Sequence, residues 1–276
     1  MSIRMTSRLE SGSKPNFNRL LATLAHRCGS YAKPGALLIL MLAAWQFVVD
    51  MGYVPSIALA SPTTTFSYIQ GHFGFLIENS LATLKVIGLG FVLALAIGMI
   101  LGMLITQIKF LEDALLPLLI VTQVIPSIAI APLLVLLLGF GDAPKIATAA
   151  SIGFFPVLIN TISGLRSIDE DMSDLARSLR ASSLQTLRQF TIPNALPYIF
   201  AGARVAITLS VIGAVVGEFV TADKGLGYLI LQGSATLSPA IIFAALAFLA
   251  IIGIALFSAV RILEYWLVPW ARVQTT

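Results

Sequence analysis

Long apolar stretches alternate with short polar stretches along this sequence. A helix that crosses a bilayer needs roughly 20 mostly apolar residues. The third apolar stretch contains three prolines, which predict a kink or a break in it. The pattern predicts an all-α polytopic membrane protein with six transmembrane helices, at residues 34–50, 80–106, 112–139, 144–163, 197–221 and 240–268.

Composition supports this prediction. Of the 276 residues, 58% are hydrophobic and only 11% are charged, whereas soluble domains carry about 25% charged residues. The net charge of +4 does not indicate a nucleic-acid partner, because the basic residues form no continuous stripe between aromatic residues. The chain is therefore expected in the lipid bilayer, with no nucleic acid bound.

The positions of Lys and Arg predict the orientation of the chain. Thirteen of the seventeen basic residues fall in the tail 1–33, the turn 107–113, the segment 164–196 or the C-terminal end. Basic residues accumulate in the cytoplasmic loops of membrane proteins. We therefore expect both termini and the 164–196 loop in the cytoplasm. The four remaining basic residues are Lys85, Lys145, Arg204 and Lys224.

The same distribution divides the chain into three parts. We expect a cytoplasmic basic tail at 1–33, a six-span unit at 34–268 and a cytoplasmic tail at 269–276. Within the first tail, the stretch NFNRLLATLAH places four apolar residues on one helical face. An interfacial helix on the inner leaflet and a disordered basic tail are both compatible with this stretch.

The polar segment SDLARSLRASSLQTLRQFTIPNALPYI, residues 173–199, interrupts the apolar pattern. Its first part predicts a short helix with Ser173 as N-cap and with Leu175 and Leu179 on one face. Ser182 and Gln185 have the spacing of a capping box, which predicts the start of a second helix. Three apolar residues give the second helix an apolar face, and two prolines are expected to end it. These residues are Leu184, Leu187, Phe190, Pro193 and Pro197.

The loop thus carries apolar residues that it cannot bury by itself. Either lipid headgroups or a cytoplasmic protein would cover them. The acidic run at 169–174 argues against lipid, because carboxylates are repelled by an anionic inner leaflet. We expect a cytoplasmic protein as the partner.

The segment resembles the coupling loop of bacterial ABC importer permeases. That motif runs from an acidic residue and an alanine to a glycine, and later to an apolar residue followed by Leu-Pro or Ile-Pro. Asp174, Ala176 and Ile192-Pro193 occupy these places. The stretches VIPSIAIAPLLVLLLGFG, FFPVLINTISGLRSID and VVGEFVTADKGLGYLI are similar to the nitrate, sulfonate and taurine branch, which includes permeases for riboflavin and thiamine pyrimidine precursors. The resemblance extends from about residue 75 to 268.

One position departs from the motif. Arg180 stands where the family usually has glycine, which turns the chain through a left-handed conformation that other residues resist. We expect the corner to be made by Ala181 and the serines instead.

The resemblance implies a permease subunit of an ATP-binding-cassette importer in a bacterial inner membrane. Cytoplasmic ABC ATPase subunits would bind the ATP, so that this chain holds no cofactor. An extracytoplasmic binding protein would deliver a small solute, and a second copy of the chain would complete the pathway. The residues expected to contact the ATPase are Asp174, Leu175, Ala176, Arg177, Ser178, Leu179, Arg180 and Ala181.

The solute is less defined. The resemblance implies a pyrimidine thiamine precursor or riboflavin, or an anion such as an alkanesulfonate, taurine or nitrate. No basic residue is expected near the midplane, which favours a neutral or aromatic solute.

Chemistry by the chain itself is not expected. No phosphate-binding Gly-rich motif occurs, and the two histidines fall on opposite sides of the membrane in this topology, so neither an enzyme nor a metal site is indicated. Two rival functions remain open: a secondary transporter or channel without an ATPase, and a scaffold without transport. The lack of a buried acidic relay and the capped helix pair argue against the first.

Polar residues inside spans are costly and are candidates for the translocation pathway. Gln123 and Asn160 either line the pathway or bond to a carbonyl freed by a proline. Ser210 belongs to a row of small residues in the fifth span that packs helices together, and the same row is also compatible with lining the pathway or the dimer interface. Glu218 either gates the outer mouth or meets the binding protein, or else it is a helix-end carboxylate that reaches water or bonds to the 222–239 loop. Arg204 is expected to extend toward the inner surface rather than to form an ion pair.

Overall fold

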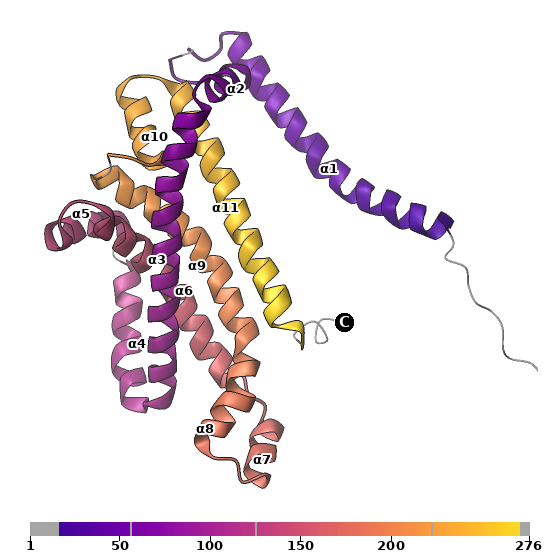
Figure 1. The fold of residues 1–276 in the computed structure, drawn as a ribbon, viewed down its shortest axis with the longest axis vertical. Coiled ribbons are helices and arrows are strands. Elements are labelled where there is room, and N and C mark those ends of the chain that lie inside the picture. Colours follow the sequence, from indigo (N-terminus) through magenta and orange to yellow (C-terminus); the bar gives the residue numbers. More distant parts are fainter. Residues whose placement is uncertain (1–16, 56, 125, 222, 271–276) are drawn as a thin grey trace, which may run out of the picture.

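The structure is a computed structural model that describes residues 17–55, 57–124, 126–221 and 223–270. Helices account for the regular structure of these residues, and no strand occurs among them (Figure 1). The elements are α1 (Phe17–Asp50), α2 (Pro62–Gly71), α3 (Phe73–Gln107), α4 (Lys109–Val124), α5 (Ser127–Leu138), α6 (Asp142–Arg166), α7 (Glu170–Ser178), α8 (Ser183–Thr186), the π-helical turn η1 (Leu187–Thr191), α9 (Ile192–Thr221), α10 (Leu226–Ala235) and α11 (Pro239–Leu267).

Five of these helices are long and apolar enough to cross a membrane. They coincide with five of the six predicted spans: Lys33–Asp50, Phe73–Gln107, Asp142–Arg166, Leu184–Thr221 and Pro239–Leu267. The sixth predicted span, 112–139, is divided between α4 and α5, and only Ile128–Leu138 within it is a shorter apolar helix. The prediction of an all-α polytopic membrane protein is confirmed.

The division of the predicted 112–139 span occurs at Pro126. Pro117 and Pro132 lie inside α4 and α5 without ending them, whereas Pro126 precedes the first residue of α5. A proline disfavours helical conformation at the residue before it and lacks an N–H, so a helix readily restarts just after it. The predicted break is therefore present, and 112–139 is two helices rather than one span.

Helix α1 extends from Phe17 through Pro34 to Asp50. The disordered alternative for the predicted basic tail is therefore wrong over residues 17–33, while residues 1–16 of that tail lie outside the described part of the chain. The membrane-spanning part of α1 has no buried residue, and it diverges from the other helices except near its C-terminal end, where the ring of Trp45 lies 4.9 Å from that of Phe243 in α11 (Figure 1). The side chain of Gln46 approaches α2 by accepting a hydrogen bond from the backbone N–H of Thr63 at 3.2 Å.

Helices α3, α6 and α9 form the centre of the bundle (Figure 1). Small residues bring them together. A Cβ atom added at Gly90 would lie 2.5 Å from the Cβ of Ala149, and one added at Gly98 would lie 2.7 Å from the Cβ of Val157. Only glycine permits this approach of α3 to α6, which is the small-residue packing typical of membrane helices.

The same principle joins α6 to α9. A Cβ atom added at Gly213 would lie 2.6 Å from the Cα of Ala149, and one at Gly217 would lie 2.8 Å from the Cα of Lys145. Because the atoms in the way belong to the backbone, no side-chain movement could relieve the overlap. The row of small residues on α9 is therefore a packing surface against α6.

Two ends of the bundle can be distinguished in Figure 1. The α7 end carries the turn between α3 and α4, the helices α7 and α8, and the last residues of α11. The α10 end carries α2 and α10. Between residues 107 and 270, every described segment that was predicted to be cytoplasmic thus lies at the α7 end. This agrees with the prediction that these segments share one side of the membrane. The side of the membrane that this end faces stays a prediction.

Candidate functional site

The α7–α8 corner, residues Glu170–Thr186, is the segment predicted to contact another protein. Helix α7 begins at Glu170, so Ser173 lies within the helix and the prediction of Ser173 as N-cap is wrong. Asp169 and Asp171 flank the true start. Negative side chains stabilise the positive N-terminal end of a helix, which explains the earlier beginning.

The corner between the two helices is made by Arg180. This residue has φ +51°, and the N–H of Ala181 donates to the carbonyl of Ala176 at 3.0 Å. A left-handed residue followed by such a six-to-one hydrogen bond is a Schellman C-cap. The prediction that Ala181 and the serines make the corner is therefore wrong, because Arg180 adopts the glycine-like conformation at a cost of roughly 1–2 kcal/mol.

The second helix starts as predicted. The backbone N–H of Ser182 donates to Oε1 of Gln185 at 2.8 Å, and the N–H of Gln185 donates to Oγ of Ser182 at 3.3 Å. These reciprocal bonds form a capping box. The chain thus leaves the left-handed residue and enters α8 with both local donors satisfied.

The prediction that Pro193 and Pro197 end the second helix is wrong. The chain continues from α8 through η1 directly into α9, and Pro197 lies inside α9. Because Pro197 has no N–H, the carbonyl of Pro193 lacks its helical partner. Nε1 of Trp270 donates to this carbonyl at 3.2 Å, so the end of α11 is attached to the base of the corner.

Several apolar side chains of the corner point to solvent. Leu175 is 47% exposed, Leu179 is 64% exposed and Leu184 is 73% exposed. Leu187 packs against the bundle, and Ala176 is only 2% exposed. Ala176 is therefore a packing residue, while the three leucines form an uncovered apolar surface.

The remaining predicted contact residues share this end of the molecule. Asp174, Ser178 and Arg180 are exposed and Ala181 is half-buried. The helix places Arg177 in α7, and its side chain lies outside the described residues.

The pathway candidates are not equivalent in the structure. Gln123 lies in α4 just before the break, and its side chain is outside the described residues. Nδ2 of Asn160 donates to the carbonyl of Pro156 at 2.8 Å. The Cβ of Asn160 would lie 2.9 Å from a Cβ added at Gly202. Asn160 therefore bonds to the backbone within α6 and packs in the interface with α9. The carbonyl that it binds is that of Pro156 itself, not a carbonyl left without a helical partner by a later proline.

Ser210 also lies between α6 and α9. Its side chain is fully buried, and its Oγ would lie 2.7 Å from a Cβ added at Gly153. Among the described residues this hydroxyl has no hydrogen-bond partner. The packing alternative for this row of small residues accounts for its position.

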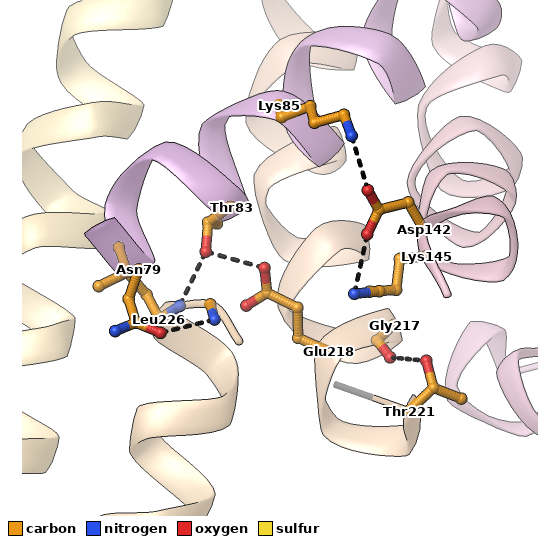
Figure 2. A network of polar contacts seen from close by, with 10 residues as sticks. Asn79, Thr83, Lys85, Asp142, Lys145, Gly217, Glu218, Thr221 and Leu226 are labelled. Atoms are coloured by element: carbon orange, nitrogen blue, oxygen red, sulfur yellow. Dashed lines mark hydrogen bonds and ion pairs between the residues drawn. The ribbon is translucent and has the colours of Figure 1, made fainter. Parts of the chain in front are cut away.

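Glu218 is the centre of a polar network at the α10 end (Figure 2). It comes from α9 and is 1% exposed. Oγ1 of Thr83 donates to its Oε1 at 2.8 Å, and the backbone N–H of Gly227 donates to its Oε2 at 2.7 Å. Glu218 thus bonds to the 222–239 loop, as one alternative predicted, and in this conformation it does not reach water or an external protein.

The network completes the N-terminus of α10. The N–H of Leu226 donates to Oγ1 of Thr83 at 2.8 Å, and the N–H of Gly225 donates to Oδ1 of Asn79 at 2.9 Å. Gly225 has φ +122°, and its missing side chain leaves room for the carboxylate of Glu218. Side chains of α3 and α9 therefore satisfy three successive donors that a helix start leaves unpaired.

Three ion pairs also join residues of the bundle. Lys145, which is buried, lies 3.1 Å from Asp142, and Lys85 lies 2.8 Å from the same carboxylate (Figure 2). Arg204 pairs with Glu264 of α11. The prediction that Arg204 extends to the surface without an ion pair is wrong, because α11 brings a carboxylate to the same depth.

Sequence reasoning missed Thr83, which donates to Glu218, and Asn79, which accepts from the N–H of Gly225 in the same network. Both stand at the start of an apolar span with helical spacing of four, and polar residues in such a span usually have a partner. The presence of Asn79 and Thr83 in an apolar span identifies them as buried hydrogen-bonding residues. Their partners, however, come from the start of α10 and from Glu218 of α9.

This arrangement of apolar helices packed through small residues, with a capped and exposed corner at one end, defines a polytopic membrane protein. Residues 94–273 match the family described as binding-protein-dependent transport system inner membrane component. The chain belongs to this family and is a permease of the ABC importer type. The family confirms the resemblance seen in the sequence and decides against an ATPase-independent carrier and a non-transporting scaffold.

Individual relatives agree with this membership. The riboflavin transport system permease protein of Chloroflexus aurantiacus is 41% identical over 239 residues, which are 84% of this chain and 88% of that protein. The formylaminopyrimidine transport permease protein of Halalkalibacterium halodurans is 36% identical over 193 residues, which are 70% of this chain and 77% of that protein.

The fold is also similar to a solved structure. A chain of the MetNI methionine ABC transporter in an inward-facing conformation matches with a TM-score of 0.57 and 18% sequence identity. The match covers 69% of this chain and 98% of that chain. At this identity the likeness concerns the fold alone.

Proposed function

We propose that two copies of this chain form the transmembrane pathway of an importer in a bacterial inner membrane. The α7 end faces the cytoplasm, and each α7–α8 corner docks on an ABC ATPase. A binding protein delivers the solute at the α10 end. The exposed apolar surface of Leu175, Leu179 and Leu184 on a rigid corner is the observation that carries this proposal.

The corner is suited to transmit force. The Schellman cap, the capping box and the Trp270 bond hold the two short helices to the base of α9 and to the end of α11. Movement of a docked ATPase would therefore reach two long helices directly. A flexible loop with the same leucines would bind a partner without moving the bundle.

The second copy is supported by α1. Its spanning part has no buried residue, and apart from the contacts of Trp45 and Gln46 near its C-terminal end it lies away from the bundle (Figure 1). In lipid, a transmembrane helix is stabilised against other helices mainly by close van der Waals packing, because no hydrophobic driving force brings helices together there. A second chain placed beside α1 would provide that packing.

The solute we propose is a neutral aromatic heterocycle of the riboflavin or formylaminopyrimidine type. The two relatives described above carry these names. Lys145 and Arg204 are each paired with a carboxylate, so their charges are compensated without an anionic solute. Sulfonates, taurine and nitrate are the alternatives to be offered in the same experiment.

The test is uptake of labelled compounds by cells that express the chain with its ATPase and binding protein. Riboflavin, a formylaminopyrimidine, an alkanesulfonate and nitrate are offered in parallel to wild type, Leu175→Asp and Leu175→Met. Aspartate removes the apolar contact, whereas methionine conserves it at similar volume. We expect one heterocycle to accumulate in wild type and in Leu175→Met, and not in Leu175→Asp.

Co-purification separates the two parts of the proposal. A tagged Leu175→Asp chain should reach the membrane in normal amount and retain less ATPase than Leu175→Met. Normal ATPase retention and uptake in Leu175→Asp would show that the corner is not the docking element. Accumulation of an anion alone would leave docking intact and overturn the proposed solute.

A further inference from the structure

A cavity of about 620 Å³ lies at the base of the α7–α8 corner. It is formed where three segments meet: the connection from α6 into α7, the first turns of α9, and the residues after α11. Its position is distinct from the exposed leucines and from the α10 end. Among the residues that line it are Ser167, Asp169, Met172, Asn194, Tyr198 and Trp270.

The walls of this cavity are held in place by specific contacts. Nδ2 of Asn194 donates to Oγ of Ser167 at 3.0 Å, and that hydroxyl donates to the carbonyl of Gly164 at 2.9 Å. Tyr198 packs over Gly164, where an added Cβ would lie 2.8 Å from the Cβ of Tyr198. Trp270 is held by its bond to the carbonyl of Pro193. A cavity with fixed walls binds a small molecule with less loss of conformational entropy than a mobile one.

The chemistry of the walls selects the charge of a ligand. Among the lining residues that the structure describes, Asp169 is the single charged one. Tyr198 and Trp270 add two partly exposed aromatic rings. Aromatic faces and a carboxylate together attract cations that are poorly hydrated, such as quaternary or aromatic ammonium groups.

We propose that this cavity binds a small organic cation on the side of the membrane that the α7 end faces. Its volume falls in the range of small-molecule sites, roughly 300–1,000 Å³. A bound cation would contact the base of the corner, α9 and the segment after α11 together. The site is independent of the transported solute and of its pathway.

The experiment uses the full-length chain in nanodiscs of phosphatidylglycerol, a lipid whose headgroup carries no cation. Choline is the probe and 3,3-dimethylbutan-1-ol, its neutral isostere, is the control. Replacement of Trp45 and Trp266 by phenylalanine leaves Trp270 as the single tryptophan, since the chain has three. We expect choline to change the fluorescence of Trp270 in a saturable manner, and the neutral isostere to cause no such change.

Two matched variants test the carboxylate. Asp169→Asn should weaken choline binding about two- to fivefold, as expected for loss of an exposed ion pair. Asp171→Asn, two residues along the same segment and outside the cavity, should bind choline like wild type. Equal responses to choline and its isostere, or equal affinities of the two variants, would overturn the proposal.

A further arm distinguishes a free cation from a cationic side chain of the partner. The titration is repeated with the ATPase bound to the chain. An unchanged response to choline supports a small-molecule site. Loss of the response would show that a lysine or arginine of the ATPase fills the cavity and would overturn the assignment. If Asp169→Asn fails to fold, the comparison of choline with its isostere on the Trp270 reporter still decides the question.

Discussion

The buried carboxylate of Glu218 allows a quantitative prediction. In Glu218→Ala, the hydroxyl of Thr83 and the N–H of Gly227 both lose their acceptor. Water cannot replace it easily, because Glu218 is only 1% exposed. Leaving a buried donor unpaired costs about 1–3 kcal/mol, and removal of the side chain adds a cavity term. We expect a total destabilisation of about 3–5 kcal/mol.

Glu218→Gln should be milder. Its amide oxygen can still accept from Gly227, and its amide nitrogen can donate to Thr83, whose own hydroxyl hydrogen is then left without an acceptor. One unpaired donor corresponds to about 1–2 kcal/mol. The order of stability is therefore wild type, then Glu218→Gln, then Glu218→Ala.

The assay is thermal unfolding of the detergent-purified chain. For chains of this size 1 kcal/mol corresponds to roughly 2–4 °C, so Glu218→Ala should lower Tm by on the order of 10 °C. The control is Glu78→Ala at the same end of the bundle, where an exposed glutamate pairs with Lys224 at 3.2 Å. Exposed ion pairs contribute little, so the control should change Tm by no more than about 2 °C.

One result would refute this reasoning. If Glu218→Ala and Glu78→Ala had the same Tm, the hydrogen bonds to Thr83 and Gly227 would not stabilise the position of α10. A loss of stability confined to Glu218→Gln, with Glu218→Ala unaffected, would refute it equally, because it would reverse the predicted order.

Three further predictions follow from close contacts and backbone conformation. Gly213→Ala should lower Tm by several degrees, because its Cβ meets backbone of α6, whereas Gly88→Ala, which has open space, should leave Tm unchanged. Arg180→Gly should keep uptake and slow hydrogen exchange at the corner, because relief of the left-handed strain outweighs the flexibility of glycine by about 0.5–1 kcal/mol. Arg180→Val should instead speed this exchange, and equal exchange rates in the two variants would show that Arg180 is not strained. Arg204→Ala and Glu264→Gln should show a coupling of about 1–2 kcal/mol in a double-mutant cycle on Tm, and additive effects would show that this ion pair is not stabilising.

Local features were predictable where their partners are close in the sequence. The capping box of Ser182 and Gln185 joins residues three apart, so its spacing predicts both hydrogen bonds. The break near Pro126 follows from the missing N–H of a proline. Apolar length alone predicted five of the spans, because crossing a bilayer sets a minimum number of residues.

Features that depend on distant residues were predicted incompletely or wrongly. Arg180 adopts a conformation that its own side chain disfavours, because capping both helices outweighs the local cost. Arg204 has an ion-pair partner sixty residues away, which no local pattern indicates. Glu218 was recognised as a candidate, but its donors Thr83 and Gly227 come from two other helices.

The sequence by itself determined that the chain is a helical membrane protein, where most spans lie, and that a capped polar segment interrupts them. These properties depend on apolar length, charge and spacing, each of which can be read from a single continuous segment of the chain. Tertiary structure alone decided that Ala176 packs inward while Leu175 and Leu179 stay uncovered. It also decided that a buried carboxylate completes α10 and that Trp270 closes the cavity beneath the corner. Such contacts join residues far apart in the chain, so they exist only once the helices have packed.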